Sequence, residues 1–258
     1  MKKCVLVTGA CINTGVDIVN KFAENGVNVV FTGRSKDKVE KALNDYKNSF
    51  KNIEIHGFVI DSLIDARTVD EKSVYNLFGY IKERRLFAET IVLNAADQGL
   101  NQKIFQSPLT DFSKVINTNV IWNYLIIETG AREMMTNGGG NVILVNSNTA
   151  YRAIPDRIAY ETSKSAQLGM MRGLALDLGK YGIRVNAVLP GMIKTDRWEK
   201  NPDFYNNVPS RFTPIGDVAT GKDIANAVYY FAAMASNTTG AELIVDGGNT
   251  IQMYPLIK

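Results

Sequence analysis

Short, almost continuously apolar runs alternate with longer stretches of helical periodicity, and this alternation constrains the fold more than any other feature of the sequence. Most of the runs consist largely of Val, Ile and Leu, which is typical of strands buried on both faces of a parallel sheet. The expected strands are residues 4–8, 27–32, 53–60, 90–94, 141–146, 183–189 and 243–245. The expected helices span about 15–25, 36–48, 70–85, 110–136, 156–180 and 221–235.

Repeated strand–helix–strand units predict right-handed crossovers and a doubly wound, Rossmann-like α/β fold around one parallel sheet. The chain has 258 residues and shows no internal repeat, low-complexity tract or linker, so we expect a single domain over 1–258. Residues 192–220 interrupt the alternation and contain several aromatic side chains, among them Trp198. We expect this excursion to be a substrate lid, or else a surface excursion with a small core of its own.

The charge balance and the few cysteines exclude several classes of protein. The chain has 29 basic and 26 acidic residues and no basic stripe, so we expect no nucleic-acid partner. No apolar stretch reaches the length that spans a bilayer, so we expect no membrane partner. Cys4, Cys11 and the single histidine, His56, predict neither a disulfide framework nor a metal site. Low cysteine use agrees with a cytoplasmic protein.

The turn after the first expected strand is a candidate phosphate-binding loop. A helix that follows a strand directly offers backbone N–H groups and a positive dipole end, and both favour a pyrophosphate. Gly9 permits the tight turn, and Gly15 permits close packing of the helix on the strand. Strand–glycine–helix turns are common in α/β proteins, so this segment alone leaves the nucleotide site open. The expected contacts in this turn are Gly9, Ile12, Asn13, Thr14 and Gly15.

The ends of the second and third expected strands carry the candidate adenosine contacts. Arg34 and Ser35 stand where a carboxylate would bind the ribose 2′-hydroxyl of NAD. Because Arg34 could pair with a 2′-phosphate, we expect NADP(H) rather than NAD(H); a solvated arginine near a helix start is the plainer alternative. Asp61 is expected at the adenine amino group with Ser62 beside it, although Asp61 could also cap the next helix.

Four residues form a candidate catalytic set. Tyr160 and Lys164 are four residues apart in an expected helix, so they share one face. A nearby ammonium lowers the pKa of a tyrosine, which favours general acid–base chemistry at Tyr160. Ser147 ends the fifth strand and could bind a substrate oxygen, whereas Asn119 could hold a water that supplies protons toward Lys164. Each alone has a plainer structural explanation, but the four in this order favour a catalytic site.

Over nearly its whole length the chain resembles the short-chain dehydrogenase/reductase family. Asn119, Ser147, Tyr160 and Lys164 match the catalytic tetrad of that family. The other matching segments are Thr8-Gly9 through Gly15, Leu93-Asn94-Ala95-Ala96, Pro190-Gly191 with Ile193 and Thr195, Gly240, and Val245-Asp246-Gly247-Gly248. Three positions depart from the family pattern: Asn13 replaces a glycine of the turn, Leu93 replaces an asparagine that braces the sheet, and Ala96 replaces a glycine.

The resemblance implies hydride transfer between a nicotinamide and a carbonyl or alcohol carbon, with Tyr160 exchanging the proton and Lys164 also holding the nicotinamide ribose. It implies the strand order 3-2-1-4-5-6-7 and a homotetramer or homodimer packed through helices 110–136 and 156–180 and the last strand. The implied cofactor contacts, beyond the turn and the adenosine end, are Asn94, Ala95, Ala96, Tyr160, Lys164, Pro190, Gly191, Ile193 and Thr195.

We expect an NADP(H)-dependent ketone reductase or alcohol dehydrogenase. Its partly apolar substrate pocket is expected to contain Ser147, Tyr151, Met192 and Trp198. A 3-oxoacyl-carrier-protein reductase is an alternative that needs a basic docking patch, for which Arg132 and Arg172 are candidates, although ordinary surface pairs would also explain them. A catalytically silent NADP(H)-binding sensor or assembly subunit is the alternative from another class.

Overall fold

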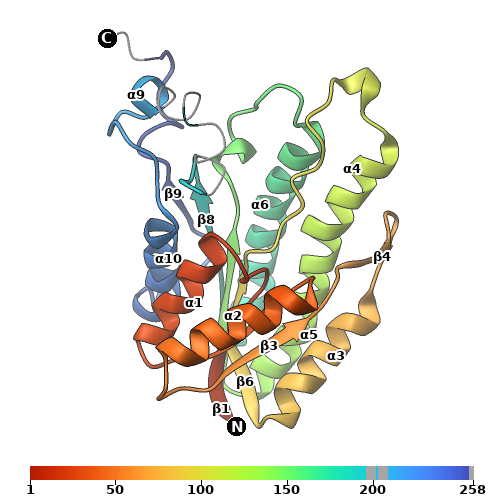
Figure 1. Ribbon diagram of the computed structural model, residues 1–258, viewed down its shortest axis with the longest axis vertical. Helices are drawn as coiled ribbons and strands as arrows, with labels where there is room; N and C mark the ends of the chain where they lie inside the picture. Colours follow the sequence, from red (N-terminus) through yellow and green to blue (C-terminus); the bar gives the residue numbers. More distant parts are fainter. Residues whose placement is uncertain (196–201, 203–208, 256–258) are drawn as a thin grey trace.

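Seven parallel strands form the central sheet of the computed structural model, which describes residues 1–195, 202 and 209–255 (Figure 1). Their order across the sheet is β3-β2-β1-β6-β7-β8-β9, which confirms the expected doubly wound architecture and strand order. The strands are β1 (Lys2–Val7), β2 (Asn28–Gly33), β3 (Ile55–Val59), β6 (Leu86–Leu93), β7 (Gly140–Val145), β8 (Ile183–Pro190) and β9 (Glu242–Val245).

Successive side chains of the strands enter two separate cores, one on each face of the sheet. On β1, Cys4 and Leu6 belong to one core, and Val5 and Val7 belong to the other. The first core is covered by α3 (Glu71–Glu83), α5 (Trp122–Thr136) and α6 (Ile158–Gly179). The second is covered by α1 (Thr14–Glu24), α2 (Lys36–Ser49) and α10 (Gly221–Tyr229). With both faces covered, the loops at the carboxyl ends of the strands are left to form a ligand site.

The helix expected over 110–136 is divided into three parts. A π-helical segment, Asn117–Ile121, separates α4 (Leu109–Ile116) from α5. Such segments are frequent at functional sites because they turn side chains away from the regular helical positions. Asn119 lies in this segment, so the interruption falls at a candidate catalytic residue.

A hairpin outside the main sheet is an element that the sequence patterns did not predict. It consists of β4 (Leu63–Asp65) paired antiparallel with β5 (Thr68–Val69). The Asp65 carboxylate closes its turn by accepting hydrogen bonds from the N–H of Arg67 at 2.8 Å and the hydroxyl of Thr68 at 3.1 Å. Asp70 then caps α3 by accepting from the N–H of Ser73 at 3.1 Å. The capping role considered for Asp61 therefore belongs to Asp70.

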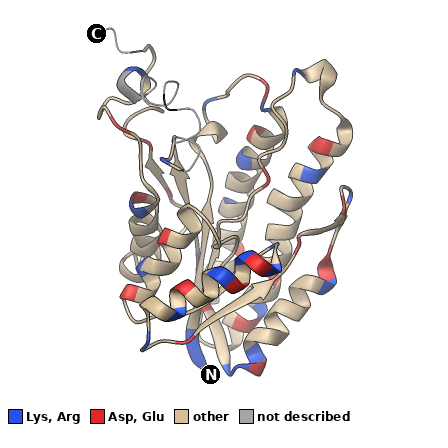
Figure 2. Cartoon of the chain, in the orientation of Figure 1, with Lys and Arg blue, Asp and Glu red and all other residues tan. Residues whose placement is uncertain are grey.

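Ile193 and Ala219, near the two ends of the stretch 192–220, form a parallel β-bridge. The described part of this stretch includes the short helix α9 (Pro209–Phe212). Figure 2 shows acidic and basic residues mixed along α2 and α3, in agreement with the nearly balanced composition. Among the helices of the described ranges, none is both long and apolar enough to cross a membrane.

Candidate active site

The turn between β1 and α1 has a backbone that few residue types can adopt. Gly9 has a φ of +66°, and a Cβ at this position would lie 2.9 Å from the Cα of Ala95. A Cβ on Gly15 would lie 2.5 Å from the carbonyl oxygen of Gly9, so α1 can approach the turn only with glycine there. Asn13 is the N-cap of α1 with a φ of +50°, which asparagine adopts more readily than most residues. Thr14 and Gly15 begin the helix, so their N–H groups face out of its positive end.

Asn94 holds the end of β6 against this turn. Its Nδ2 donates to the carbonyl oxygens of Thr8 at 3.1 Å and Gly9 at 3.0 Å. The hydroxyl of Thr8 in turn accepts from the N–H groups of Asn94 and Ala95, each at 3.0 Å. Leu93 is buried in the core covered by α3, α5 and α6, so packing replaces the polar brace of the family pattern. The turn and the end of β6 therefore form one fixed unit.

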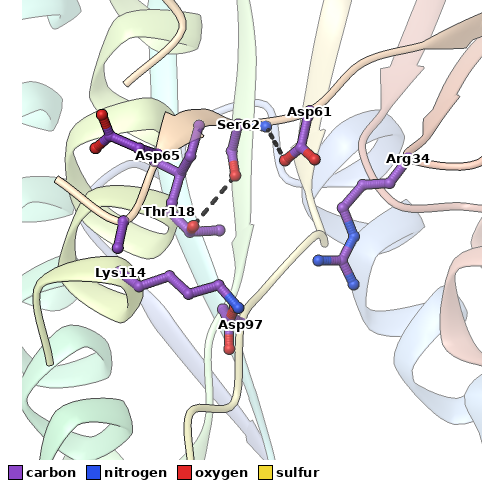
Figure 3. A pocket seen from close by; sticks show the side chains of 9 residues that line it. Arg34, Asp61, Ser62, Asp65, Asp97, Lys114 and Thr118 are labelled. Carbon is purple, nitrogen blue, oxygen red and sulfur yellow. Dashed lines mark hydrogen bonds and ion pairs between the residues drawn. The ribbon is translucent and has the colours of Figure 1, made fainter. Parts of the chain in front are cut away.

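A cavity of about 270 Å³ lies at the ends of β2 and β3 (Figure 3). Figure 3 shows the side chains of Arg34 and Lys114 reaching toward it from opposite sides. Lys114 pairs with Asp97 at 3.0 Å, whereas Arg34 has no carboxylate of a described residue within 4.0 Å. Among the described residues, the cavity thus offers one cation, Arg34, that forms no ion pair at contact distance, although its charge still acts on Asp97. Its lining consists of Arg34, Asp61, Ser62, Leu63, Asp65, Ala66, Asp97, Lys114 and Thr118.

The expected adenosine contacts come together at this cavity. The exposed Asp61 accepts a hydrogen bond from the N–H of Ser62 at 2.7 Å. The buried hydroxyl of Ser62 is 3.1 Å from that of Thr118, which links the β4–β5 hairpin to the π-helical segment. Ser35 lies beside Arg34 at the N-cap of α2. Sequence reasoning missed the β4–β5 hairpin, which lines one side of the cavity, because strands of two or three residues show no periodic pattern.

Tyr160 lies near two cations at the start of α6. The Nζ of Lys164 is 5.5 Å from the centroid of the half-buried tyrosine ring, and the guanidinium carbon of Arg157 is 5.1 Å from it. Arg157 also donates to the side-chain oxygen of Asn101 at 2.8 Å. Sequence reasoning missed Arg157, although a spacing of three residues from Tyr160 predicts proximity. Because a guanidinium stays protonated, Tyr160 lies beside a permanent positive charge.

Lys164 is almost completely buried, with 1% of its surface exposed. Its Nζ donates to the carbonyl oxygen of Val145, the last residue of β7, at 2.9 Å. Burial disfavours the ammonium form and lowers the pKa of Lys164 to about 7. The charge of Lys164 therefore changes close to neutral pH, unlike that of Arg157.

Ser147 follows β7 and faces the residues just after it. Its hydroxyl oxygen accepts from the N–H of Thr149 at 3.2 Å and from the hydroxyl of Thr149 at 3.0 Å. With both lone pairs engaged, the hydroxyl proton of Ser147 remains available for another acceptor. The segment Asn148–Ala150 packs against α6, which carries Tyr160 and Lys164.

The carboxyl end of β8 carries the expected nicotinamide contacts. Pro190 ends the strand, and Gly191 donates its N–H to the carbonyl oxygen of Val245 at 3.1 Å. A Cβ on Gly191 would lie 2.6 Å from the Cβ of Asp246, so the strand and the last turn can meet only with glycine here. Ile193 and Thr195 follow, both partly buried.

The four expected substrate-pocket residues do not behave alike. Ser147 and the partly buried Met192 lie at the carboxyl ends of β7 and β8. Tyr151 is 55% exposed, and its hydroxyl donates to Glu242 at the opposite, amino end of β9. Glu242 also pairs with Arg172 at 2.8 Å, so the Tyr151 hydroxyl belongs to a surface cluster. Trp198 lies outside the described residues.

These residues fit a nicotinamide dinucleotide. Added Cβ atoms would fill the turn at Gly9 and Gly15, so the chain keeps a cradle there that side chains would obstruct. The cavity of about 270 Å³ beside Arg34 has room and a guanidinium for a charged adenosine end, and no described carboxylate pairs with that guanidinium. At the other end, the Nζ of Lys164 is 5.5 Å from the ring centroid of Tyr160, so a phenol and a lysine are present for the acid–base chemistry that a nicotinamide requires. In open parallel sheets, ligands bind at the carboxyl ends of the strands, where all three features lie.

Comparisons with known proteins agree with this arrangement. A family model described as "Enoyl-(Acyl carrier protein) reductase" matches residues 9–250. A 3alpha-hydroxysteroid dehydrogenase from Mediterraneibacter gnavus is 32% identical, with 95% of this chain and 96% of the relative covered. An NADP-dependent (R)-specific alcohol dehydrogenase from Lentilactobacillus kefiri is 31% identical, with 97% of each covered. A 3-oxoacyl-acyl-carrier-protein reductase from Rickettsia bellii is 29% identical over 94% of this chain and 95% of the relative.

Solved structures show the same fold. ElxO with NADP bound has 30% sequence identity and a TM-score of 0.85, covering 98% of this chain and 100% of that one. An NAD+-bound xylitol dehydrogenase has 26% identity and a TM-score of 0.82, covering 96% and 98%. With the strand order, the turn and the tetrad side chains described above, these matches show that the chain belongs to the short-chain dehydrogenase/reductase family and is an oxidoreductase of hydroxyl and carbonyl groups.

Proposed function

We propose that this enzyme is an NADP(H)-dependent ketone reductase or alcohol dehydrogenase in which Tyr160 is the acid–base residue. The observation that carries the proposal is the position of Tyr160 near Lys164 and Arg157, on the helix that packs against the segment after Ser147. When bound, the nicotinamide supplies hydride to the carbonyl carbon or accepts it from the alcohol. The chain itself has to bind the substrate oxygen and move one proton.

In the reductive direction, the hydroxyl of Tyr160 gives its proton to the substrate oxygen. Lys164 and Arg157 stabilise the phenolate that this transfer leaves behind. The hydroxyl of Ser147 donates a hydrogen bond to the same oxygen. Its proton is free for this because Ser147 only accepts in its two bonds with Thr149. Lys164 would also hold the nicotinamide ribose, and Met192 would contribute apolar surface to the substrate pocket.

The proposed cofactor is NADP(H), bound by the residues named in the turn, at the adenosine cavity and at the ends of β6 and β8. Arg34, which lacks a protein counter-ion in the described chain, would pair with the 2′-phosphate, and Ser35 would add a hydrogen bond. The similarity to NADP-bound ElxO and to the NADP-dependent Lentilactobacillus enzyme supports NADP, whereas the similar xylitol dehydrogenase was solved with NAD+ bound. The positive charge of Arg34 favours NADP(H) over NAD(H).

A carrier-bound 3-oxoacyl substrate is the second candidate, favoured by the similarity to the 3-oxoacyl-acyl-carrier-protein reductase of Rickettsia bellii. The proposed docking arginines are already engaged: Arg132 pairs with Glu128 of α5, and Arg172 pairs with Glu242 of β9. This pairing favours a small ketone. A catalytically silent sensor would have no need of the acid–base arrangement at Tyr160.

We also propose that the enzyme is cytoplasmic and assembles as a homotetramer or homodimer. The outer faces of α5 and α6 expose apolar side chains, including Tyr124 at 49% and Leu176 at 84%. Association of two copies through these helices would bury them. Light scattering from the purified protein measures the assembly directly.

The test is oxidation of NADPH and NADH with a panel of ketones, and reduction of both oxidised cofactors with the matching alcohols. We expect turnover with at least one pair, faster with the phosphorylated cofactor, and a loss of about 10²- to 10⁴-fold in Tyr160→Phe. A carrier-bound substrate that outcompetes every small ketone would favour the second candidate. Wild type that binds NADPH but turns over nothing would contradict the proposal and favour the silent alternative.

A further inference from the structure

Two buried side-chain amides connect residues of the tetrad. Asn146 is 4% exposed and Gln167 is 1% exposed. The Oδ1 of Asn146 accepts from the N–H of Ser147 at 2.7 Å, and its Nδ2 donates to the carbonyl oxygen of Lys164 at 2.9 Å. That Nδ2 also donates to the Oε1 of Gln167 at 3.0 Å. The Nε2 of Gln167 then donates to the carbonyl oxygen of Asn119 at 2.6 Å.

The hydrogen-bonding capacity of the Asn119 carbonyl is filled by protein groups. Besides Gln167, the Nδ2 of Asn123 donates to this oxygen at 2.9 Å, and a carbonyl oxygen has two lone pairs. The side chain of Asn119 is engaged as well, with Asp97 at 2.8 Å through two bonds and with the hydroxyl of Ser163 at 2.9 Å. The relay water expected at Asn119 therefore has no free acceptor on this carbonyl.

Gln167 lies on the same face of α6 as the two catalytic side chains, because it is seven residues beyond Tyr160 and three beyond Lys164. Packing alone would not select an amide here, since the buried positions that follow it on this helix, Leu168 and Met171, are apolar. A buried amide is stable only when its partners are present, and a fully connected network fixes one arrangement of those partners. The partners here are the main chains of Asn119 and, through Asn146, of Ser147 and Lys164.

We propose that Gln167 is a positioning residue for the tetrad and takes the place of a relay water at Asn119. Together with Asn146 it joins the π-helical segment, the end of β7 and the middle of α6 through side-chain amides. Proton exchange between Tyr160 or Lys164 and solvent then follows a route that does not use a water bound to the Asn119 carbonyl. This inference rests on the proposed roles of the tetrad.

Two substitutions at this position separate the hydrogen bonds from the volume. Gln167→Met keeps the length and removes both bonds, so we expect kcat to fall about tenfold while KM for NADPH changes by less than about twofold. Gln167→Glu can donate to the Asn119 carbonyl only while its carboxyl group is protonated. Its kcat should approach the wild-type value at low pH and fall as pH rises through the pKa of that carboxyl. The pH profiles of wild type and Gln167→Met should lack this decrease.

Asn186 provides the matched control. It is 1% exposed, donates to the carbonyl oxygen of Thr238 at 2.9 Å and accepts from the N–H of Ala241 at 3.0 Å, within β8 and its neighbouring loop. Asn186→Leu should lower Tm as Gln167→Met does, but leave kcat unchanged. The proposal is overturned if Gln167→Met keeps the wild-type kcat, or if Asn186→Leu loses as much activity.

A second measurement decides the inference independently of turnover. In crystal structures that resolve ordered water, wild type should show none within hydrogen-bonding distance of the Asn119 carbonyl, and Gln167→Met should gain one. A water on this carbonyl in wild type would overturn the proposal even in a folded, active enzyme. If wild type binds NADPH without turnover, the proposed function fails, and these structures still show whether Gln167 occupies the carbonyl.

Discussion

Around Tyr160 the polar groups are buried and bonded to one another, whereas at the adenosine end charged side chains surround an open cavity. Asn119 and Lys164 are at most 1% exposed, but Arg34 is exposed and Lys114 is 46% exposed. Electrostatic interactions are strong in the first environment and screened by water and salt in the second. Substitutions near Tyr160 should therefore change rate and stability, and those around the cavity should change affinity and cofactor choice.

Of the substitutions that distinguish the surroundings of Tyr160 from the adenosine cavity, Ser147→Ala is expected to have the largest effect. Removing a hydrogen-bond donor to the reacting oxygen should lower kcat by about 10²- to 10³-fold, with little change in the Kd of NADPH. Steady-state kinetics and fluorescence titration measure the two quantities. Thr149→Val is the control, because it removes a bond to the Ser147 hydroxyl but leaves that hydroxyl in place. Equal losses in the two variants would show that the effect is structural.

A smaller effect is expected for Arg34→Ala at the open end. Loss of one charge-assisted bond should weaken NADPH binding by roughly tenfold to a hundredfold and leave NADH binding unchanged. Calorimetric titration with both cofactors tests this. Lys36→Ala is the control, because Lys36 is an exposed neighbouring cation that pairs with Glu40 at 3.8 Å. A parallel loss for both cofactors would contradict the 2′-phosphate role.

The depressed pKa of Lys164 predicts a dependence of stability on pH. In the folded chain the pKa is about 7, and in the unfolded chain it returns to about 10.4, so the unfolded state binds more protons between these values. The cost of burying the charge is full below pH 7 and declines as pH rises to about 10. Lys164→Met should therefore raise the Tm of the cofactor-free protein most at low pH.

Calorimetric melts from pH 6 to about 10 should show that this advantage shrinks steadily. An advantage that is constant with pH would mean that Lys164 keeps its charge when buried. The comparison also separates Lys164 from Arg157, whose charge does not change in this range.

The smallest effect is expected for Lys114→Met. Its ion pair with Asp97 is partly exposed, so its loss should change stability by about 0.2–1 kcal/mol. Burial raises the pKa of Asp97, but the hydrogen bond from Gly99 and the Lys114 ammonium outweigh it and hold the pKa below its usual value. We expect NADPH affinity to fall by less than about fivefold, and a loss as large as that of Arg34→Ala would mean that Lys114 shares the phosphate.

Local patterns predicted most of the fold and the tetrad. The strands follow from apolar runs, and Tyr160 and Lys164 follow from their spacing within one helix. β6 begins four residues before the expected strand, because Leu86, Phe87 and Ala88 are buried and pair with the start of β1. The start of β6 is therefore determined by pairing with β1 and not by the local sequence pattern.

The features that sequence reasoning missed depend on contacts between distant segments. Gln167 looks like any polar residue of a helix until the carbonyl of Asn119, 48 residues away, is brought to its amide. The π-helical segment and the residue before the β4–β5 hairpin are likewise joined by a bond between distant residues, Ser62 and Thr118. From the sequence we expect Tyr151 in a partly apolar pocket, and no local pattern indicates that the hydroxyl of Tyr151 donates to Glu242 of β9. Chain order alone does not specify these pairs.

Transfer of deuterium from NADPH labelled at nicotinamide C4 tests the proposed role of Tyr160 most directly. In a single turnover with a reactive ketone, wild type should place the label on the carbinol carbon from one of the two C4 stereoisomers. Tyr160→Phe should bind NADPH with unchanged Kd and transfer the label at least about a hundredfold more slowly. Transfer at the wild-type rate by Tyr160→Phe, or NADPH binding by wild type without any transfer, would contradict the acid–base role of this tyrosine.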